Sequence, residues 1–327
     1  MKTKLFLTRR LPEPVMKKLS ETFDLRYNEE DRVLSKEEII ENIKWCEILL
    51  CLLTDAIDKD VIAAKPNLKG IVNYAAGFNN IDLAEASKHG IPVTNTPDVL
   101  SETTADLAFT LICSIARRIV EADRFTRAGK FKGWEPELLL GRDIHHKTLG
   151  LIGAGKIGSE VAKRATGFEM KICYNNMSVN KELESATDAK FVELPHLLKQ
   201  SDFISIHVPL TDKTHHMLGK KELALMKENA YLINTSRGAV IDEEALVNAL
   251  KSNQIAGAAL DVYESEPQIH PELINLSNVI LLPHIGSASK ATRVKMGMLA
   301  ADNAVAISKG KIPPNIVNKE IYNRGDL

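Results

Sequence analysis

The sequence predicts an α/β protein of two doubly wound parallel-sheet domains joined by two long helices. Short apolar segments of strand length alternate with helical segments along the chain, a rhythm typical of parallel sheets covered by helices. In the middle of the chain, the apolar run 148–152 leads into the segment 153–158 (GAGKIG), which opens a helical pattern. Strand, glycines and helix in this order are typical of a Rossmann-like dinucleotide-binding unit.

Length and composition indicate an ordinary globular protein. The chain has 327 residues, of which 44% are hydrophobic and 26% are charged, and its formal net charge is −1. This balance gives no bulk attraction for nucleic acid or for an anionic membrane surface. The longest apolar stretches, such as 48–53, fall far short of the roughly 20 residues of a membrane span. We therefore expect neither partner, and we expect no signal peptide because residues 1–5 run straight into a strand.

The four cysteines lie in apolar segments without C-x-x-C spacing. They are Cys46, Cys51, Cys113 and Cys173. Such cysteines are typical of buried free thiols in a reducing compartment rather than of disulfides or a metal site. The expected location is therefore the cytoplasm.

The first hundred residues predict a complete small α/β domain. Strands are expected at 4–8, 24–27, 47–53, 70–75 and 92–95, and helices at 13–21, after the capping box at Ser35, at 58–64 and at 83–89. From Ser101 the pattern becomes that of one helix of about 27 residues, ending at Gly129, and a second long pattern covers 290–308. Such helices can carry the chain into a second domain and back. We therefore expect a flavodoxin-like substrate domain of 1–100 plus 288–327, and a dinucleotide-binding Rossmann domain of 101–287.

The glycines of the central motif have distinct expected roles. Gly153 allows the tight turn, Gly155 lets backbone N–H groups approach a pyrophosphate, and Gly158 lets the helix pack closely on the strand. A glycine-rich turn without a ligand is the plain alternative. An apolar strand at 170–174, where the first strand-helix-strand unit should close, favours the dinucleotide.

Polar side chains follow three strands of the second domain, for which six strands are expected at 148–152, 170–174, 203–207, 230–234, 256–260 and 279–282. Arg237, Glu266 and His284 come after the last three, at the edge where such sheets bind ligands. An arginine binds a carboxylate through two parallel bonds, a histidine exchanges a proton near neutral pH, and a neighbouring carboxylate stabilises its charged form. Taken singly, each residue has a simpler explanation: Arg237 as part of a surface ion pair, Glu266 as a solvated loop residue, and His284 as a residue at a helix start. Together they predict hydride transfer to an oxo acid that bears a carboxylate.

These motifs resemble those of the D-isomer-specific 2-hydroxyacid dehydrogenase family, and most closely its glyoxylate/hydroxypyruvate reductase branch. The resemblance covers nearly the whole chain. It rests on the glycine motif, the three strand ends and the segments 73–82 (NYAAGFNNID), 95–97 (NTP), 104–106 (TAD) and 147–150 (KTLG), and for the branch on 50–54 (LCLLT) and Trp134. It implies that Arg237, Glu266 and His284 are the catalytic residues.

The resemblance also implies ligand-binding residues in both domains. Backbone N–H groups of Ala76 and Gly77 would hold the substrate carboxylate together with Arg237, and Leu53 and His284 would also contact the substrate. The implied cofactor contacts are Thr104, Gly153, Gly155, Lys156, Ile157, Gly158, Asn175, Asn176, Val208, Thr235, Ser236, Asp261 and Gly286. No metal is implied, and we expect a homodimer.

The residue at the expected ribose position leaves the choice of cofactor open. An aspartate there would favour NAD, whereas Asn175 carries no charge to repel the 2′-phosphate of NADP. The following segment 176–178 lacks the arginine usual in NADP-dependent relatives, so that Lys181 is the nearest cation. We expect NADP or NAD, with NADP favoured on electrostatic grounds.

The expected function is NAD(P)-dependent reduction of a small 2-oxo acid, glyoxylate or hydroxypyruvate. One alternative is a dinucleotide-sensing regulator like the corepressors that resemble this family, although the lack of a long polar tail favours an enzyme. A second alternative is a dehydrogenase of the same family that acts on 3-phosphoglycerate or D-lactate. Formate dehydrogenase is disfavoured because that relative has glutamine at the position of Glu266. The histidines 145–146 and 215–216 are interpreted as loop residues and not as metal ligands. They are adjacent rather than four residues apart, and no carboxylate or cysteine cluster accompanies them.

Overall fold

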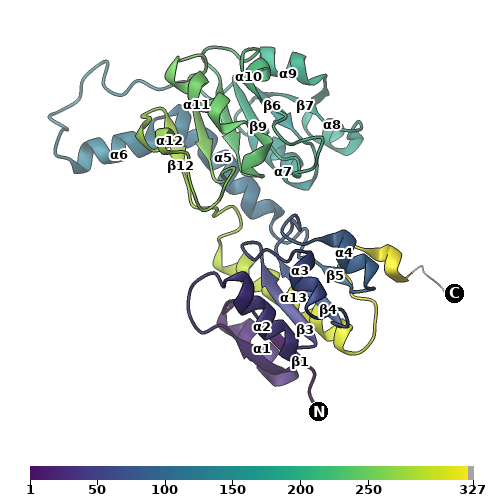
Figure 1. Ribbon diagram of the computed structural model, residues 1–327. Coiled ribbons are helices and arrows are strands. Elements are labelled where there is room, and N and C mark those ends of the chain that lie inside the picture. Colours follow the sequence, from purple (N-terminus) through teal and green to yellow (C-terminus); the bar gives the residue numbers. More distant parts are fainter. Residues whose placement is uncertain (323–327) are drawn as a thin grey trace. The chain divides into compact units, whose positions relative to one another are not determined.

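The computed structural model describes residues 1–322, and the chain divides into two compact units. Unit 1 comprises Met1–Leu100 and the described part of the segment that begins at Ser287, and unit 2 comprises Ser101–Gly286. Each unit contains a parallel sheet with helices on both faces (Figure 1). This confirms the predicted fold class of two doubly wound α/β domains.

The sheet of unit 1 has the strand order β2-β1-β3-β4-β5. Its strands are β1 (Lys4–Leu7), β2 (Asp24–Tyr27), β3 (Ile48–Leu52), β4 (Gly70–Tyr74) and β5 (Val93–Thr94). Its helices are α1 (Glu13–Thr22), α2 (Lys36–Trp45), α3 (Lys59–Ala63), α4 (Leu83–Lys88), α13 (Lys290–Ser308) and the short η2 (Lys319–Tyr322). Helices α1 and α13 pack together on one face, and α2, α3 and α4 cover the core on the other (Figure 1). This strand order is that of flavodoxin-like sheets.

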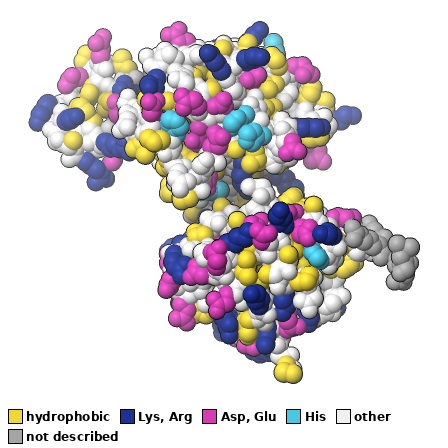
Figure 2. Space-filling model, in the orientation of Figure 1, with side chains coloured by type: hydrophobic (Ala, Val, Ile, Leu, Met, Phe, Trp, Pro, Cys, Tyr) yellow, Lys and Arg dark blue, Asp and Glu magenta, His cyan; other side chains and the backbone are white. Residues whose placement is uncertain are grey.

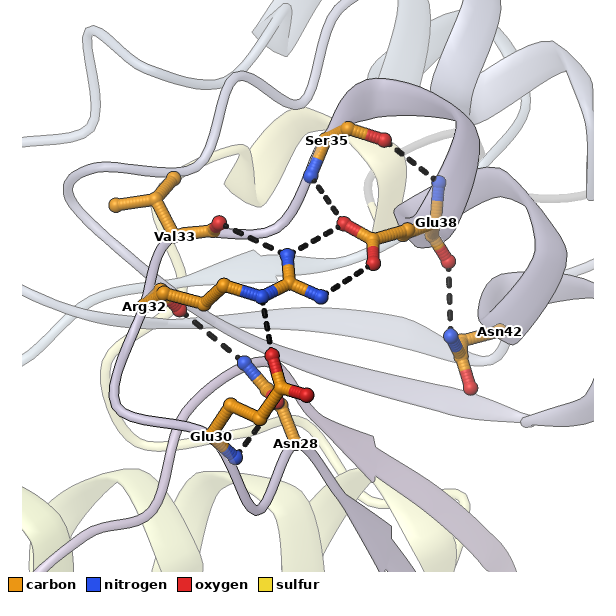
Figure 3. Close-up of polar contacts among 7 residues, drawn as sticks. All are labelled: Asn28, Glu30, Arg32, Val33, Ser35, Glu38 and Asn42. Atoms are coloured by element: carbon orange, nitrogen blue, oxygen red, sulfur yellow. Dashed lines mark hydrogen bonds and ion pairs between the residues drawn. The ribbon is translucent and has the colours of Figure 1, made fainter.

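The start of α2 illustrates how the sequence determines a helix boundary. The Ser35 hydroxyl accepts a hydrogen bond from the backbone N–H of Glu38, and the Glu38 carboxylate accepts one from the N–H of Ser35. The Arg32 guanidinium donates to both oxygens of the same carboxylate, at 2.8 and 2.6 Å (Figure 3). The predicted capping box is thus present, and an arginine ties it to the preceding loop.

The sheet of unit 2 has the order β12-β11-β10-β9-β6-β7-β8. Its strands are β6 (Thr148–Ile152), β7 (Lys171–Asn175), β8 (Lys190–Phe191), β9 (Phe203–Ile206), β10 (Tyr231–Asn234), β11 (Gly257–Leu260) and β12 (Val279–Leu281). The helices are α5 (Ser101–Ala116), α6 (Ile119–Arg127), α7 (Lys156–Thr166), α8 (Lys181–Thr187), α9 (Leu194–Gln200), α10 (Lys220–Leu223), η1 (Gly238–Val240), α11 (Glu243–Lys251) and α12 (Pro271–Asn275). The six predicted strands are present, together with the short edge strand β8. The strand order reverses between β6 and β9, which is where ligands bind in such sheets.

The prediction of one continuous helix from Ser101 to Gly129 is wrong. The helix ends at Ala116 and a second one, α6, begins at Ile119, because Arg118 adopts a left-handed conformation with φ of 53°. The Ala116 carbonyl accepts its hydrogen bond from the backbone N–H of Arg142, at 2.8 Å, rather than from the next helical turn. The chain passes between the units at Leu100–Ser101 and Gly286–Ser287, so α5 belongs wholly to unit 2 and α13 to unit 1.

Two further expectations concern cysteines and membranes. All four cysteines are free thiols, with Cys46, Cys51 and Cys173 buried and Cys113 half-buried. Within residues 1–322, the helices are too short or too polar to cross a bilayer.

Candidate active site

The glycine motif forms a tight turn between β6 and α7. Gly153 has φ of 97°, and a Cβ atom there would lie 2.7 Å from the carbonyl carbon of His207, so this position requires glycine. A Cβ on Gly158 would lie 2.2 Å from the carbonyl oxygen of Gly153, which shows how closely the helix approaches the turn. By contrast, a Cβ on Gly155, the N-cap residue of α7, would meet nothing within 4 Å. The helix N-terminus is therefore open to an anion such as a pyrophosphate.

The turn after β10 contains an unsatisfied buried hydroxyl. Asn234, which is fully buried, accepts hydrogen bonds from the N–H and the hydroxyl of Ser236 and donates one to the carbonyl of Arg237. Between them, the Thr235 hydroxyl is buried and lacks a hydrogen-bond partner among the described residues. Buried polar groups are almost always paired, so this hydroxyl fits a site that a ligand completes. Together with the open glycine turn, it makes this edge of the sheet fit a nicotinamide dinucleotide.

Asp261, at the end of β11, positions the loop that carries His284. Its two carboxylate oxygens accept hydrogen bonds from the backbone N–H groups of Ile285 and Gly286, each at 2.7 Å, and its carbonyl accepts one from His284. His284 has φ of 53°, an unfavourable conformation that persists because these bonds fix the backbone. Burial raises the pKa of Asp261.

His284 and Glu266 form the ion pair expected from the sequence. The Nδ1 atom of His284 lies 2.8 Å from an oxygen of Glu266, and the other Glu266 oxygen accepts a hydrogen bond from the N–H of Tyr263. Burial acts to raise the pKa of Glu266, but the hydrogen bond from His284 and the charges of His284 and Arg237 outweigh it, so the pKa is lowered. Glu266 is thus held as a carboxylate that fixes the orientation of the imidazole.

Arg237 lies in a turn pressed against the loop of Glu266. A Cβ on the following Gly238 would lie 1.8 Å from the carbonyl carbon of Tyr263, so the chains of the two loops touch. The guanidinium donates to the carbonyl of Ser236, and burial lowers its pKa while the charge of Glu266 acts in the opposite direction. Arginine nevertheless stays protonated in proteins. The three predicted catalytic residues therefore lie on neighbouring loops of one unit.

The expected ribose position lies beside the glycine turn. Asn175 is the last residue of β7, paired in register with Ile152, and its carbonyl accepts a hydrogen bond from the N–H of Gly153. Its side-chain amide donates to the carbonyl of Val192, whereas that of Asn176 donates to the carbonyl of Ser178. The remaining predicted cofactor residues of unit 2 lie at the same edge of the sheet or beside its loops: Lys156 and Ile157 begin α7, Val208 follows β9, and Thr104 lies near Gly286.

The predicted carboxylate-binding residues lie in unit 1, in the loop after β4. Three carbonyls of this loop accept hydrogen bonds: that of Ala75 from the N–H of Thr96, that of Ala76 from the side chain of Asn95, and that of Gly77 from the side chain of Asn73. In a trans peptide the N–H points opposite to the preceding carbonyl. The N–H groups of Ala76 and Gly77 are therefore directed away from Thr96 and Asn95, as an anion site requires.

The loop after β3, which carries Leu53, is fixed by a buried carboxylate. Asp55 accepts hydrogen bonds from the N–H of Leu52 and from the hydroxyl of Thr8, and burial raises its pKa. The Asn80 side chain donates to the carbonyls of Leu52 and Asp55, which joins this loop to the loop after β4.

Sequence reasoning missed these supporting residues. Asn234 ends a buried strand and Asn73 lies within one, and a buried asparagine in such a strand is a signal that could have been used. Asn95 lies in the segment 95–97 on which the resemblance rests, but its role was not predicted. Asp55 lies in a loop, where nothing in the sequence distinguishes it from a solvated residue. The structure brings the predicted residues of unit 2 together at one sheet edge, whereas Leu53, Ala76 and Gly77 form a second group in unit 1.

Comparison with known proteins supports the same assignment. Residues 109–286 match the model of the family described as D-isomer specific 2-hydroxyacid dehydrogenase, NAD binding domain. A glyoxylate reductase of Thermococcus litoralis is 50% identical over 325 residues, covering 98% of both chains. The crystal structure of a glyoxylate reductase from Paecilomyes thermophila has a TM-score of 0.86 and 36% identity and covers 98% of this chain and 99% of its own. An NADPH-dependent glyoxylate/hydroxypyruvate reductase from Sinorhizobium meliloti, solved with NADP and malonate, has a TM-score of 0.88 and 28% identity over the full length of both chains.

These matches confirm the resemblance seen in the sequence and the enzyme class that it implied. They also confirm the cofactor class, NAD or NADP. The chain belongs to the D-isomer specific 2-hydroxyacid dehydrogenase family and is an oxidoreductase of its glyoxylate reductase branch.

Proposed function

We propose that this protein reduces glyoxylate or hydroxypyruvate by reversible hydride transfer between a nicotinamide cofactor and C2 of the 2-oxo acid. This proposal rests mainly on the pair formed by Glu266 and His284. Together with Arg237, these residues lie in the loops after β10, β11 and β12, in the unit that contains the glycine turn. All three relatives described above are named reductases, which favours this function over a regulator or a dehydrogenase of phosphoglycerate or lactate.

Each residue of the proposed site has a distinct role in the reaction. When bound, the cofactor supplies the hydride. Arg237 binds and polarises the oxo acid, and the N–H groups of Ala76 and Gly77 bind its carboxylate, with Leu53 contacting the substrate. Protonated His284 donates a proton to the developing alkoxide, and Glu266 stabilises the imidazolium beforehand.

The cofactor proposed here is NADP in preference to NAD. Asn175 places an uncharged amide where a carboxylate would repel a 2′-phosphate. The remaining contacts are the predicted ones, with the pyrophosphate at Gly155, Lys156 and Ile157. The Sinorhizobium relative, solved with NADP, uses the phosphorylated cofactor.

We also propose a homodimer located in the cytoplasm, with no nucleic acid partner. Large apolar side chains are exposed on α6 and the segment after it, with Ile119, Phe131, Trp134 and Leu140 all more than half exposed. A second copy that covered them would remove this surface from water. Light scattering should give twice the monomer mass, and Ile119→Glu should lower it.

A panel of substrates tests the function. Reduction of glyoxylate, hydroxypyruvate, pyruvate and 3-phosphohydroxypyruvate should be measured with NADPH and with NADH. The proposal requires the highest kcat/KM for glyoxylate or hydroxypyruvate. A preference for pyruvate or 3-phosphohydroxypyruvate would instead support a dehydrogenase that acts on lactate or phosphoglycerate. No turnover of any oxo acid would support the alternative of a dinucleotide-sensing regulator.

A further inference from the structure

The structure brings a carboxylate to one of the two adjacent histidine pairs that the sequence analysis interpreted as loop residues. The Nε2 atom of His216, in the loop after β9, lies 2.7 Å from an oxygen of Glu264, in the loop after β11. The rings of His215 and His216 are stacked, with centroids 4.1 Å apart. One ligand atom from each of the three residues lies within 4.8 Å of those of the other two. No spacing rule in the sequence joins residues 215–216 to 264, so only the fold reveals this group.

The two loops that carry these side chains are both anchored to the segment 239–243. The N–H of His216 donates to the carbonyl of Ala239, which fixes the histidine loop against η1. Glu264 exchanges hydrogen bonds with Glu243: its N–H donates to the Glu243 carboxylate at 2.7 Å, and its own second oxygen accepts from the N–H of Glu243. One Glu264 oxygen is therefore anchored, and the other faces His216.

The surroundings favour a cation. A cavity of about 390 Å³ beside His216 and Glu264 is also lined by Asp242, Glu243 and Glu244, and neither lysine nor arginine occurs among the described residues that line it. Figure 2 shows histidine side chains among acidic ones on this face of unit 2. The side chains of His216 and Glu264 are 37% and 30% exposed, so an ion can reach them from solvent. Carboxylates grouped in this way raise the local concentration of cations.

We propose that His215, His216 and Glu264 form a binding site for a divalent transition-metal ion such as Zn²⁺. Two imidazoles and one carboxylate are the donors that zinc prefers, whereas Mg²⁺ and Ca²⁺ prefer oxygen alone. In a tetrahedral zinc site, ligand atoms lie about 3.3 Å apart, so small side-chain rotations bring the three donors into position and leave a fourth place for water. The ion replaces the hydrogen bond between His216 and Glu264 and links the loop after β9 to the loop that carries Glu266.

Metal titration of the full chain tests this site. After treatment with a chelator, the protein should be titrated with Zn²⁺ in competition with a chromophoric indicator, and with Co²⁺ while its visible absorption is recorded. The proposal expects one ion per chain, tetrahedral Co²⁺ absorption bands, and a higher Tm with Zn²⁺. His215→Ala and Glu264→Gln should each weaken binding at least about tenfold and remove the Tm increase.

The second histidine pair provides a matched control. His146 also lies close to a carboxylate, 3.1 Å from Glu169, but the rings of His145 and His146 meet edge-on with centroids 5.1 Å apart. The double variant His145→Ala/His146→Ala should bind Zn²⁺ as the wild type does. Failure of the wild type to bind, equal binding by the wild type, His215→Ala and Glu264→Gln, or loss of binding only in the control would overturn the proposal. The Tm of each variant without metal shows whether it is folded.

Discussion

The two units present their proposed ligand-binding groups in different chemical forms. In unit 2 the groups are the ionisable side chains of Arg237, Glu266 and His284, each placed by a loop after a strand. In unit 1 they are the backbone N–H groups of Ala76 and Gly77, directed by the hydrogen bonds to the carbonyls of Ala75 and Ala76. In the proposed mechanism, ligand binding thus depends on side-chain identity in unit 2 and on backbone orientation in unit 1. Substitutions should therefore act differently in the two units.

The largest effect is expected in unit 2, from removing the side chain of Arg237. Arg237→Ala should lower kcat/KM more than a hundredfold, a loss of about 3 kcal/mol of transition-state stabilisation. Arg237→Lys should weaken substrate binding because a point charge replaces a two-pronged donor. Steady-state kinetics of both variants measure the loss of activity, and thermal unfolding measures the loss of stability. We expect a large fall in kcat/KM and only a small fall in Tm. Near wild-type turnover would remove Arg237 from the proposed mechanism.

A change of cofactor preference is the next effect in size. Asn175→Asp adds a negative charge at the proposed ribose site and should shift the ratio of kcat/KM for NADH over NADPH upwards about tenfold, within the roughly 1 to 3 kcal/mol of such repulsion. The control is Asn248→Asp, at an exposed position of α11, whose amide donates to the carbonyl of Glu244. An unchanged ratio in Asn175→Asp would refute the role given to Asn175.

In unit 1, loosening the backbone should affect binding rather than catalysis. Asn95→Ala releases the Ala76 carbonyl and should raise KM for the oxo acid about fivefold to tenfold with little change in kcat, since about 1 kcal/mol is typical for one hydrogen bond. Asn42→Ala is the control, because Asn42, a half-buried residue of α2, also donates to a carbonyl of unit 1, that of Glu38 (Figure 3). An equal KM in both variants would contradict the proposed carboxylate site.

The smallest expected effect concerns the acid stability of unit 2. Burial lowers the pKa of His207, beneath the glycine turn, to about 3. The unfolded chain then binds a proton below about pH 6.5 that the folded chain does not, so stability is lost as pH falls from 6.5 towards 3. We expect a loss of about 1 kcal/mol between pH 7 and 5, since part of the residue is exposed to water. Denaturant unfolding of His207→Asn should show less of this loss, whereas His196→Asn, at the surface of α9, should retain it.

The charged residues could be predicted from the sequence because their positions follow from strand pattern alone. A loop that follows a buried strand begins at the ligand-binding edge of a parallel sheet, and Arg237, Glu266 and His284 lie in three such loops. The break at Arg118 could not be predicted in this way, because it depends on a hydrogen bond from Arg142, a residue distant in the sequence. The supporting roles of Asp55 and Asn95 are hidden for the same reason. They hold backbone groups that no side-chain pattern reveals.

The proposed mechanism requires Glu266 to support His284, the group that donates the proton during reduction. The most direct measurement is kcat/KM for reduction against pH in the wild type and in Glu266→Gln, with a deuterated cofactor used to show that hydride transfer limits the rate. Reduction needs the imidazolium, so the rate should fall as pH rises, and oxidation of the 2-hydroxy acid should rise over the same interval. Glu266→Gln keeps the shape but removes the carboxylate that pairs with Nδ1 of His284, and it should lower kcat/KM for reduction across the profile. Superimposable profiles of the two proteins would contradict the account and require another proton donor.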